Sequence, residues 1–176
     1  MAIDRQKTET VHWHAVFTAS RAEKKVRDRL EELGVECFLP VQTVLRQWTY
    51  RKSRVVVPVI AGLVFVRVGR QEQVKVLQTK GVVAFLRLKG EAGAAVIPDK
   101  QMEGFRFLLD FSEEAVEMTN ENIKAGDLVR VVKGSLRGME GELIRHKGVT
   151  KVLVRIDMLG CAMVNIPASF VEKLNK

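Results

Sequence analysis

The sequence predicts an α+β fold in two domains, an antiparallel sheet with helices over residues 9–111 and a small all-β barrel over residues 123–176. In the first domain, strand alternation and helical periodicity follow one another in the order β-α-β-β-α-β-α, which is the order of a split βαβ arrangement. In the second domain, short β-branched runs flank a glycine-rich loop. Residues 112–122 carry four glutamates and no basic residue, which indicates an acidic linker or an extension of the preceding helix.

The first strand and the first helix are predicted between residues 11 and 33. The segment VHWHAVFT at 11–18 alternates as a strand with one buried face does. Ser20 followed by Glu23 matches a capping box, and Gly34 suits the end of a helix. The apolar residues between these signals recur at helical spacing: Ala22, Val26, Leu30 and Leu33.

Two β-rich runs follow, at residues 37–45 and 55–68, and Pro58 marks an edge or a bulge in the second run. Residues 70–78 are expected to form a short helix that turns Val74 and Leu77 inward. These elements continue the predicted sheet and its helices.

The last elements of the first domain are a strand and a helix. Gly81 opens the strand VVAFLRL, and Pro98 at the first helical position starts the helix. This helix is expected to turn Met102, Phe105 and Leu109 inward. In a split βαβ arrangement the helices cover one face of the sheet, so the other face is left for a partner.

The second domain begins with the stretch KAGDLVRVVKGSLRGMEGELI at residues 124–144. Two β-type runs, 128–132 and 142–144, flank a loop with glycines at 134, 138 and 141, which predicts a sharp connection between paired strands. β-Branched residues are frequent at 128–132 and 151–156, and glycine weakens helices, so we expect a stable β-barrel here.

Composition describes a basic globular protein. The chain has 176 residues, 47% of them hydrophobic, and a net charge of +8 with a pI of about 9.7. Residues 1–111 hold 19 basic and 12 acidic residues, and residues 123–176 hold 10 and 5. This charge favours an anionic partner such as nucleic acid. The polar N-terminus and the lack of about 20 consecutive apolar residues predict a cytoplasmic protein outside the membrane.

No residue pattern indicates an enzyme or a cofactor. Cys37 and Cys161 are single and distant in sequence, so we expect two small buried hydrophobes and neither a disulfide nor a metal site. His12 and His14 share a strand face without a neighbouring carboxylate or thiol, which favours surface histidines over metal ligands. Nucleophile, Walker and dinucleotide motifs are missing from the sequence.

Both domains resemble one family. The order GD, alternating Val/Arg strand, G-x-x-x-G-x-x-G and second strand resembles the KOW motif of NusG-type transcription factors and some ribosomal proteins, the alternative being any small glycine-rich barrel. The segments WHAVFTA, CFLPV, GLVFV and VVAFLR, with the helix after Ile-Pro, resemble the NusG N-terminal domain. The resemblance extends over nearly all of residues 11–174.

The resemblance implies a NusG/RfaH-type elongation and antitermination factor, monomeric and without cofactor, that binds the clamp region of RNA polymerase. It places the polymerase contact at Trp13, Ile60, Leu63 and Phe65, although an ordinary core role is the alternative for these residues. Non-template DNA and nascent RNA are the expected nucleic-acid partners. A ribosomal protein or Rho would bind the KOW domain, through the positions Leu136, Met139 and Leu159.

The residues themselves predict a nucleic-acid contact at 46–54, RQWTYRKSR. Basic side chains attract phosphates and aromatic rings stack on unpaired bases, while a solvated hairpin tip is an equally good interpretation. Three basic residues at the start of the first helix extend this surface. The full candidate set is Arg21, Lys24, Lys25, Arg46, Trp48, Tyr50, Arg51, Lys52 and Arg54.

Departures from the usual family residues favour a specialised, operon-directed antiterminator. Ala61 and Leu63 stand where Pro and an aromatic residue are common, Ser135 and Leu136 where Pro and Phe are common, and Cys161 where Arg is usual. A housekeeping NusG factor and a ribosome-associated RNA-binding KOW protein are the alternatives.

Overall fold

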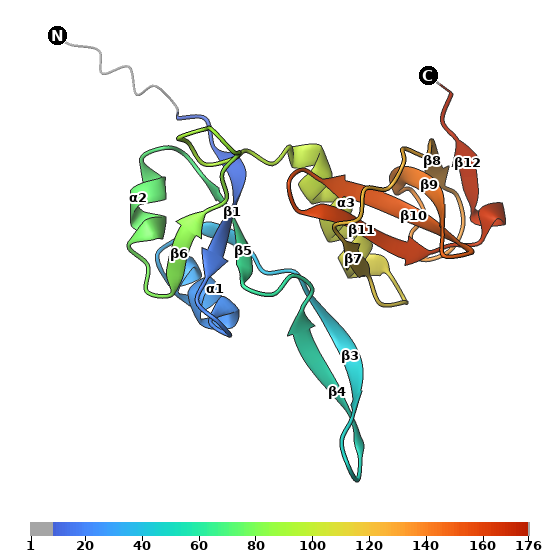
Figure 1. Ribbon diagram of the computed structural model, residues 1–176, viewed down its shortest axis with the longest axis horizontal. Helices are drawn as coiled ribbons and strands as arrows, with labels where there is room; N and C mark the ends of the chain where they lie inside the picture. Colours follow the sequence, from blue (N-terminus) through green and yellow to red (C-terminus); the bar gives the residue numbers. More distant parts are fainter. Residues whose placement is uncertain (1–8, 176) are drawn as a thin grey trace. The chain divides into compact units, whose positions relative to one another are not determined.

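The computed structural model describes residues 9–175, which form two compact units (Figure 1). One unit combines the chain up to Leu39 with Gly62–Val96, and the other combines Pro40–Ala61 with the chain from Ile97 onward. This division groups the central hairpin and the third helix with the C-terminal strands.

The first unit is built on a four-stranded sheet. Its strands are β1 (His12–Thr18), β2 (Glu36–Phe38), β5 (Leu63–Val68) and β6 (Val82–Phe85), in the order β2-β5-β1-β6. Every neighbouring pair is antiparallel. Helix α1 (Glu23–Glu32) packs on β2 and β5. The predicted antiparallel sheet with helices is therefore confirmed.

The start of α1 differs from the capping box that the sequence predicts. Ala22 is the N-cap residue and no side chain caps the helix, so the assignment of Ser20 is wrong. The Glu23 carboxylate is instead buried and accepts a hydrogen bond of 2.7 Å from the Gly62 backbone N–H. A long-range acceptor thus replaces the local one, and it fixes the loop that precedes β5 against the helix.

The end of α1 follows the prediction. Gly34 has a φ of +74°, and its N–H donates to the Glu31 carbonyl at 2.9 Å. The N–H of Val35 donates to the Leu30 carbonyl at 2.9 Å, which completes a Schellman motif. Glycine tolerates the left-handed backbone that this motif requires.

The two long β-rich runs are each interrupted. The run 37–45 divides at Leu39 and Pro40 into β2 and β3 (Val41–Gln47), and the run 55–68 divides into β4 (Lys52–Pro58) and β5. Pro40 cannot donate a ladder hydrogen bond, which explains why pairing stops beside it. β3 and β4 pair with each other in a separate two-stranded ribbon.

Two helices form where the sequence predicts them, but the residues that face inward differ from the prediction. In α2 (Glu72–Leu77) Val76 is buried, whereas Val74 and Leu77 are exposed, so their predicted inward orientation is wrong. In α3 (Asp99–Phe111) Leu108 is buried with Met102 and Phe105, in place of Leu109. A helical face is set by what covers it, and an error of one residue rotates the face by about 100°.

The second unit contains a six-stranded antiparallel sheet in the order β12-β8-β9-β10-β11-β7. Its strands are β7 (Glu117–Thr119), β8 (Asp127–Val131), β9 (Glu140–His146), β10 (Val149–Ile156), β11 (Gly160–Asn165) and β12 (Val171–Lys173), with the short helix η1 (Ala168–Phe170) before β12. β8 pairs with β9 around the loop that carries Gly134 and Gly138, as the sequence predicts, whereas Gly141 lies inside β9 opposite Val129 rather than in the loop. Within residues 9–175 no pairing joins β12 to β7, so this sheet is open and a closed barrel is not formed by its ladders.

The acidic segment 112–122 contributes β7 to this sheet. Met118 lies opposite Ala162 of β11, and the Glu117 carboxylate accepts from the buried Lys151 ammonium at 2.6 Å. The Gln42 side chain holds Val116 from the other side, accepting its N–H at 2.9 Å and donating to its carbonyl at 3.2 Å. In this part of the segment the chain is held by strand pairing rather than acting as a free connector.

Helix α3 lies beside β10 in the same unit (Figure 1). A Cβ at Gly104 would lie 3.4 Å from a side-chain carbon of Val154, which is an ordinary van der Waals contact, so this helix position packs against the strand. The Gln101 side chain accepts the Asp157 N–H at 2.8 Å beside this contact. No helix among the described residues is long and apolar enough to cross a membrane.

Candidate functional site

The predicted nucleic-acid segment forms the tip of the β3–β4 hairpin. Trp48 and Arg51 exchange backbone hydrogen bonds of 2.8 and 3.3 Å, which leaves Thr49 and Tyr50 as a two-residue loop. Tyr50 is 97% exposed and Trp48 is 56% exposed. The Trp48 indole N–H donates to the Ser53 hydroxyl at 3.1 Å, which orients its ring. Both aromatic rings are therefore exposed to solvent, and the Ser53 contact orients the ring of Trp48.

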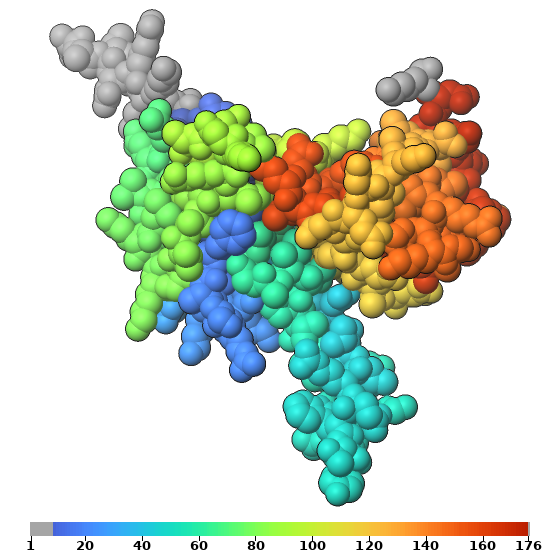
Figure 2. All heavy atoms as spheres, in the orientation of Figure 1, coloured from blue at the N-terminus to red at the C-terminus, as the bar shows by residue number. Residues whose placement is uncertain are grey.

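Basic side chains occupy both faces of this hairpin. Gln47 lies opposite Lys52, Arg46 opposite Ser53, and Leu45 opposite Arg54. Successive side chains along a strand point to opposite faces, so Lys52 and Arg54 share one face and Arg46 lies on the other. All four basic residues of the segment are exposed. No acidic residue occurs from position 37 to 71, so no local carboxylate neutralises them. Figure 2 shows the cyan tip projecting into solvent.

The three basic residues at the start of α1 are exposed in the first unit. Arg21 has a φ of +58°, a left-handed backbone that costs a non-glycine residue energy. Lys24 and Lys25 lie in the first turn of the helix beside the acidic Glu23. The structure places these residues and the hairpin in different units.

The predicted polymerase pocket is largely core. Trp13, Leu63 and Phe65 are buried, with Leu63 only 2% exposed, and Ile60 alone is half-buried. Buried side chains contribute little contact area to a partner, so the direct contacts assigned to these three residues stay a prediction.

Sequence reasoning passed over Phe17 as a candidate. Phe17 lies opposite Leu63 across β1 and β5 and is 42% exposed. Directly opposed residues share a sheet face, so this aromatic ring is an accessible apolar group on the face that carries Leu63. The alternation of β1 already placed Phe17 on the face of Trp13, which is the signal that could have identified it.

The two strand histidines differ from the prediction of two surface residues. His14 is buried, with its Nδ1 2.8 Å from the Ala95 carbonyl and its ring edge-on to Phe85 at 5.8 Å between centroids. Burial lowers the pKa of His14, and the hydrogen bond to Ala95 opposes this shift only in part. His12 is exposed. Among residues 9–175 no cluster of three potential metal ligands occurs.

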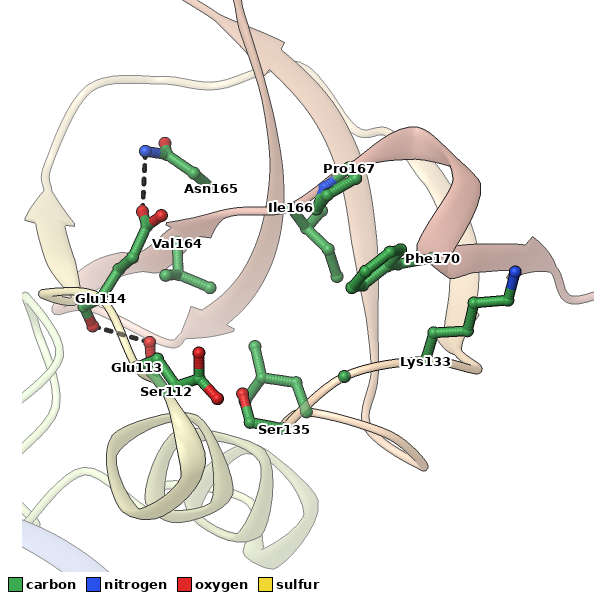
Figure 3. A pocket seen from close by; sticks show the side chains of 12 residues that line it. Ser112, Glu113, Glu114, Lys133, Ser135, Val164, Asn165, Ile166, Pro167 and Phe170 are labelled. Carbon is green, nitrogen blue, oxygen red and sulfur yellow. Dashed lines mark hydrogen bonds between the residues drawn. The ribbon is translucent and has the colours of Figure 1, made fainter.

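The predicted KOW partner residues are also mostly internal. Leu136 and Met139 are buried and Leu159 is half-buried. Leu136, Ile166 and Phe170 line a cavity of about 170 Å³. Figure 3 shows Ile166 and Phe170 in its wall. Because Ile166 and Phe170 lie about thirty residues further along the chain, no local pattern could identify this cavity.

Family membership follows from a comparison of sequences. The model of the family described as Transcription termination factor nusG matches residues 11–106, more than half of the chain. The chain belongs to the NusG family. The family that the strand and loop motifs resemble is thus confirmed, and NusG-family proteins are transcription factors rather than enzymes. No curated protein sequence matches the chain.

Three solved structures are similar to this NusG-family chain. A structure described as the domain interaction in Thermotoga maritima NusG is 22% identical, covers 94% of this chain and 98% of its own, and has a TM-score of 0.49. Conformation B of the MjSpt4:Spt5 complex is 17% identical, with coverages of 93% and 97% and a TM-score of 0.31. Conformation A is 17% identical, with coverages of 93% and 99% and a TM-score of 0.29.

A two-point ion pair lies in the C-terminal sheet of this NusG-family protein. The Arg155 guanidinium contacts both Glu142 carboxylate oxygens, at 2.6 and 2.9 Å, and also donates to the Ile123 carbonyl at 3.0 Å. The Gly126 N–H donates to Glu142 at 3.0 Å. Desolvation opposes ionisation, but the hydrogen bonds from Arg155 and Gly126 prevail and lower the pKa of Glu142.

Both thiols are chemically quiet. Burial raises the pKa of Cys37 to about 11, and nearby Glu31 adds to the effect. Burial likewise raises the pKa of Cys161, which the Arg155 charge opposes. A thiol with a raised pKa is a poor nucleophile at neutral pH. Both cysteines are free; Cys161 is buried, as predicted, whereas Cys37 is only half-buried.

Proposed function

We propose that this chain is a transcription elongation factor that binds the clamp region of RNA polymerase, suppresses pausing or termination, and acts at a restricted set of operons. The observation that carries the proposal is the family match over residues 11–106. The match covers the first unit and most of α3, so the proposed polymerase-binding domain is residues 9–111, followed by the acidic segment 112–122 and a KOW domain at 123–176.

The proposed polymerase contacts are the exposed Phe17 ring in the first unit and the turn at Ile60 in the second unit. Ile60 and Ala61 precede Gly62, whose φ of +70° and hydrogen bond to Glu23 hold this turn in place. Trp13, Leu63 and Phe65 are buried on the strands β1 and β5 beside Phe17 and would support its ring. An apolar surface on a preformed support binds a helical partner with a small ordering cost.

The proposed nucleic-acid contact is the β3–β4 hairpin tip. Four basic residues without a local acidic neighbour attract the phosphate backbone, and the exposed rings of Trp48 and Tyr50 offer stacking surfaces for unpaired bases. Displaced non-template DNA in an elongation complex has both features. Nascent RNA shares them and is the second proposed ligand.

Operon specificity is proposed from the residues that depart from the family pattern. A factor with Ala61 in the turn before β5, Leu63 at the start of β5, and Ser135 and Leu136 in the KOW loop would compete with a general paralogue for one polymerase surface. Specificity is then the difference between the affinities of the two factors for polymerase at a given operon. A recruiting contact to DNA, to RNA, to a ribosomal protein or to Rho can supply this difference.

Genome-wide occupancy of the tagged protein tests this proposal. The expected profile is confined to one or a few transcription units, and deletion of the gene should lower distal transcription in those units alone. The general paralogue, measured in the same cells, provides the control for a broad profile. Occupancy across most genes would contradict the specialised role, and co-purification with ribosomal subunits in place of polymerase would contradict the polymerase role.

A further inference from the structure

The second unit contains a small cavity whose walls come from three separate segments (Figure 3). Residues 112–114 follow α3, residues 133–136 form the loop after β8, and residues 164–170 connect β11 to η1. Its volume is about 170 Å³. Pockets for nucleotides and drug-sized ligands measure about 300–1,000 Å³, so this cavity suits a single side chain.

The cavity has an apolar floor and an acidic rim. Leu136, Val164 and Ile166 are buried, and the half-buried Phe170 ring covers the backbone of Gly134. The apolar surface favours the aliphatic stem of a long side chain, which can lie against it while its polar end stays at the rim.

One carboxylate at the rim is available to a ligand. The Glu114 carboxylate accepts from the Asn165 amide at 2.9 Å, and the Glu114 carbonyl accepts from the Ser112 hydroxyl at 2.7 Å. Glu113 is exposed and makes no hydrogen bond or ion pair with any residue in 9–175. In Figure 3 its carboxylate is directed toward the loop that carries Ser135.

The charges of the rim select a cation. Two carboxylates, Glu113 and Glu114, face one ammonium group, that of Lys133. An anion such as phosphate would be repelled by both carboxylates. A cationic side chain gains from the same field, because Glu113 forms no ion pair with any residue in 9–175.

We propose that this cavity binds an arginine side chain in an extended segment of a partner protein. A planar guanidinium can pair with both oxygens of Glu113 and stack on the Phe170 ring, which an ammonium group cannot do. The arginine would belong to the partner protein that the proposed function assigns to the KOW domain. Only the identity of this partner rests on the proposed function.

The test uses the full-length, ¹⁵N-labelled protein and three tripeptides: acetyl-Gly-Arg-Gly-amide, the citrulline analogue, and the lysine analogue. Citrulline keeps the shape of arginine but lacks its charge. The arginine peptide should shift the amide signals of residues 134–136 and 164–170, and the citrulline peptide should bind about fivefold more weakly, as expected for one partly exposed charge pair.

Two variants assign the charge to its residue. Glu113→Gln should abolish the difference between arginine and citrulline, whereas the matched change Glu172→Gln, on the exposed strand β12, should leave it intact. Lys133→Gln should strengthen arginine binding because it removes a like charge from the rim. None of these residues is buried, so each variant is expected to fold.

Several outcomes would overturn the inference. These are equal binding of the arginine and citrulline peptides, binding unchanged by Glu113→Gln, shifts located outside the cavity, or no shifts at millimolar peptide. Preference for the lysine peptide would replace arginine with lysine as the ligand. Because polymerase is absent from these measurements, their failure leaves the proposed elongation role standing.

Discussion

Arg155 on β10 and Glu142 on β9 form a two-point ion pair, with N···O distances of 2.6 and 2.9 Å, in the C-terminal sheet. The same arginine reaches the Ile123 carbonyl, and the same glutamate receives the Gly126 N–H. The pair therefore fastens the chain before β8 to the middle of the sheet. It links a segment with no regular structure to two paired strands.

Replacing Glu142 should destabilise the second unit in a pH-dependent way. The native pKa of Glu142 lies below its ordinary value of 4.5, so its contribution is full above pH 4.5 and is lost as the pH falls through the native pKa. At pH 7, Glu142→Gln should lower the free energy of unfolding by about 1–2 kcal/mol, allowing for the partial exposure of Arg155. Urea titrations at several pH values measure this, and Glu172→Gln is the control. An equal deficit at acidic and neutral pH would contradict the assignment.

Arg21→Gly should stabilise the first unit. Arg21 has a φ of +58°, where a non-glycine residue costs about 1–2 kcal/mol, and the greater flexibility of unfolded glycine offsets part of this. We expect a net gain of about 0.5–1 kcal/mol in thermal or urea unfolding. Lys25→Gly, inside helix α1, should instead lose about 1 kcal/mol. A loss of stability in both variants would show that Arg21 makes contacts that outweigh its backbone strain.

Leu63→Asp and Ile60→Asp should separate core from contact surface. Leu63 is fully buried, so an unpaired carboxylate there should unfold the first unit. The loss of folding free energy should exceed the roughly 2–5 kcal/mol lost when a buried leucine is truncated to alanine. Ile60 is half-buried, so Ile60→Asp should stay folded and lose binding to core RNA polymerase. Thermal melts and pull-downs of both variants measure the difference. A folded Ile60→Asp protein that binds polymerase normally would remove this turn from the proposed contact.

The hairpin tip should account for part of the salt dependence of nucleic-acid binding. Each phosphate contact on a single strand contributes about 0.7 to the slope of log K against log salt, so Arg51→Gln with Lys52→Gln should reduce the slope by about 1.4. Fluorescence anisotropy with single-stranded DNA at several salt concentrations measures the slope. Arg137→Gln with Lys147→Gln, in loops of the C-terminal sheet, is the charge-matched control. An identical reduction in both double variants would indicate a general charge effect.

Both thiols should resist alkylation in the native protein. The pKa of Cys37 is raised to about 11 and that of Cys161 is raised by burial, so little thiolate is present at pH 7.5. Mass spectrometry after brief iodoacetamide treatment should show an unmodified native protein and two modified cysteines in urea. Rapid modification of native Cys37 would indicate that its environment is more open than the structure describes.

Local patterns were sufficient to predict most regular elements. The alternation in β1, the helical spacing in α1, and the loop glycines between β8 and β9 each depend on neighbours a few residues away. Gly34 ends α1 because only a left-handed residue completes its Schellman motif, a requirement visible within six residues. The charge distribution likewise indicated the basic hairpin segment, since exposed basic residues need no distant partner.

The tertiary structure alone decided which of these residues are accessible. His14 is buried and its ring contacts the Ala95 carbonyl, 81 residues away. The Glu23 carboxylate accepts from the Gly62 N–H, 39 residues away, and takes no part in capping its own helix. Glu117 belongs to a sheet strand because it meets β11 and Lys151. Burial and long-range hydrogen bonds depend on what the rest of the chain brings to a position, and a periodic pattern carries no information about that partner. For this reason the sequence predicted the strands and helices, and the fold determined which of their side chains a partner can reach.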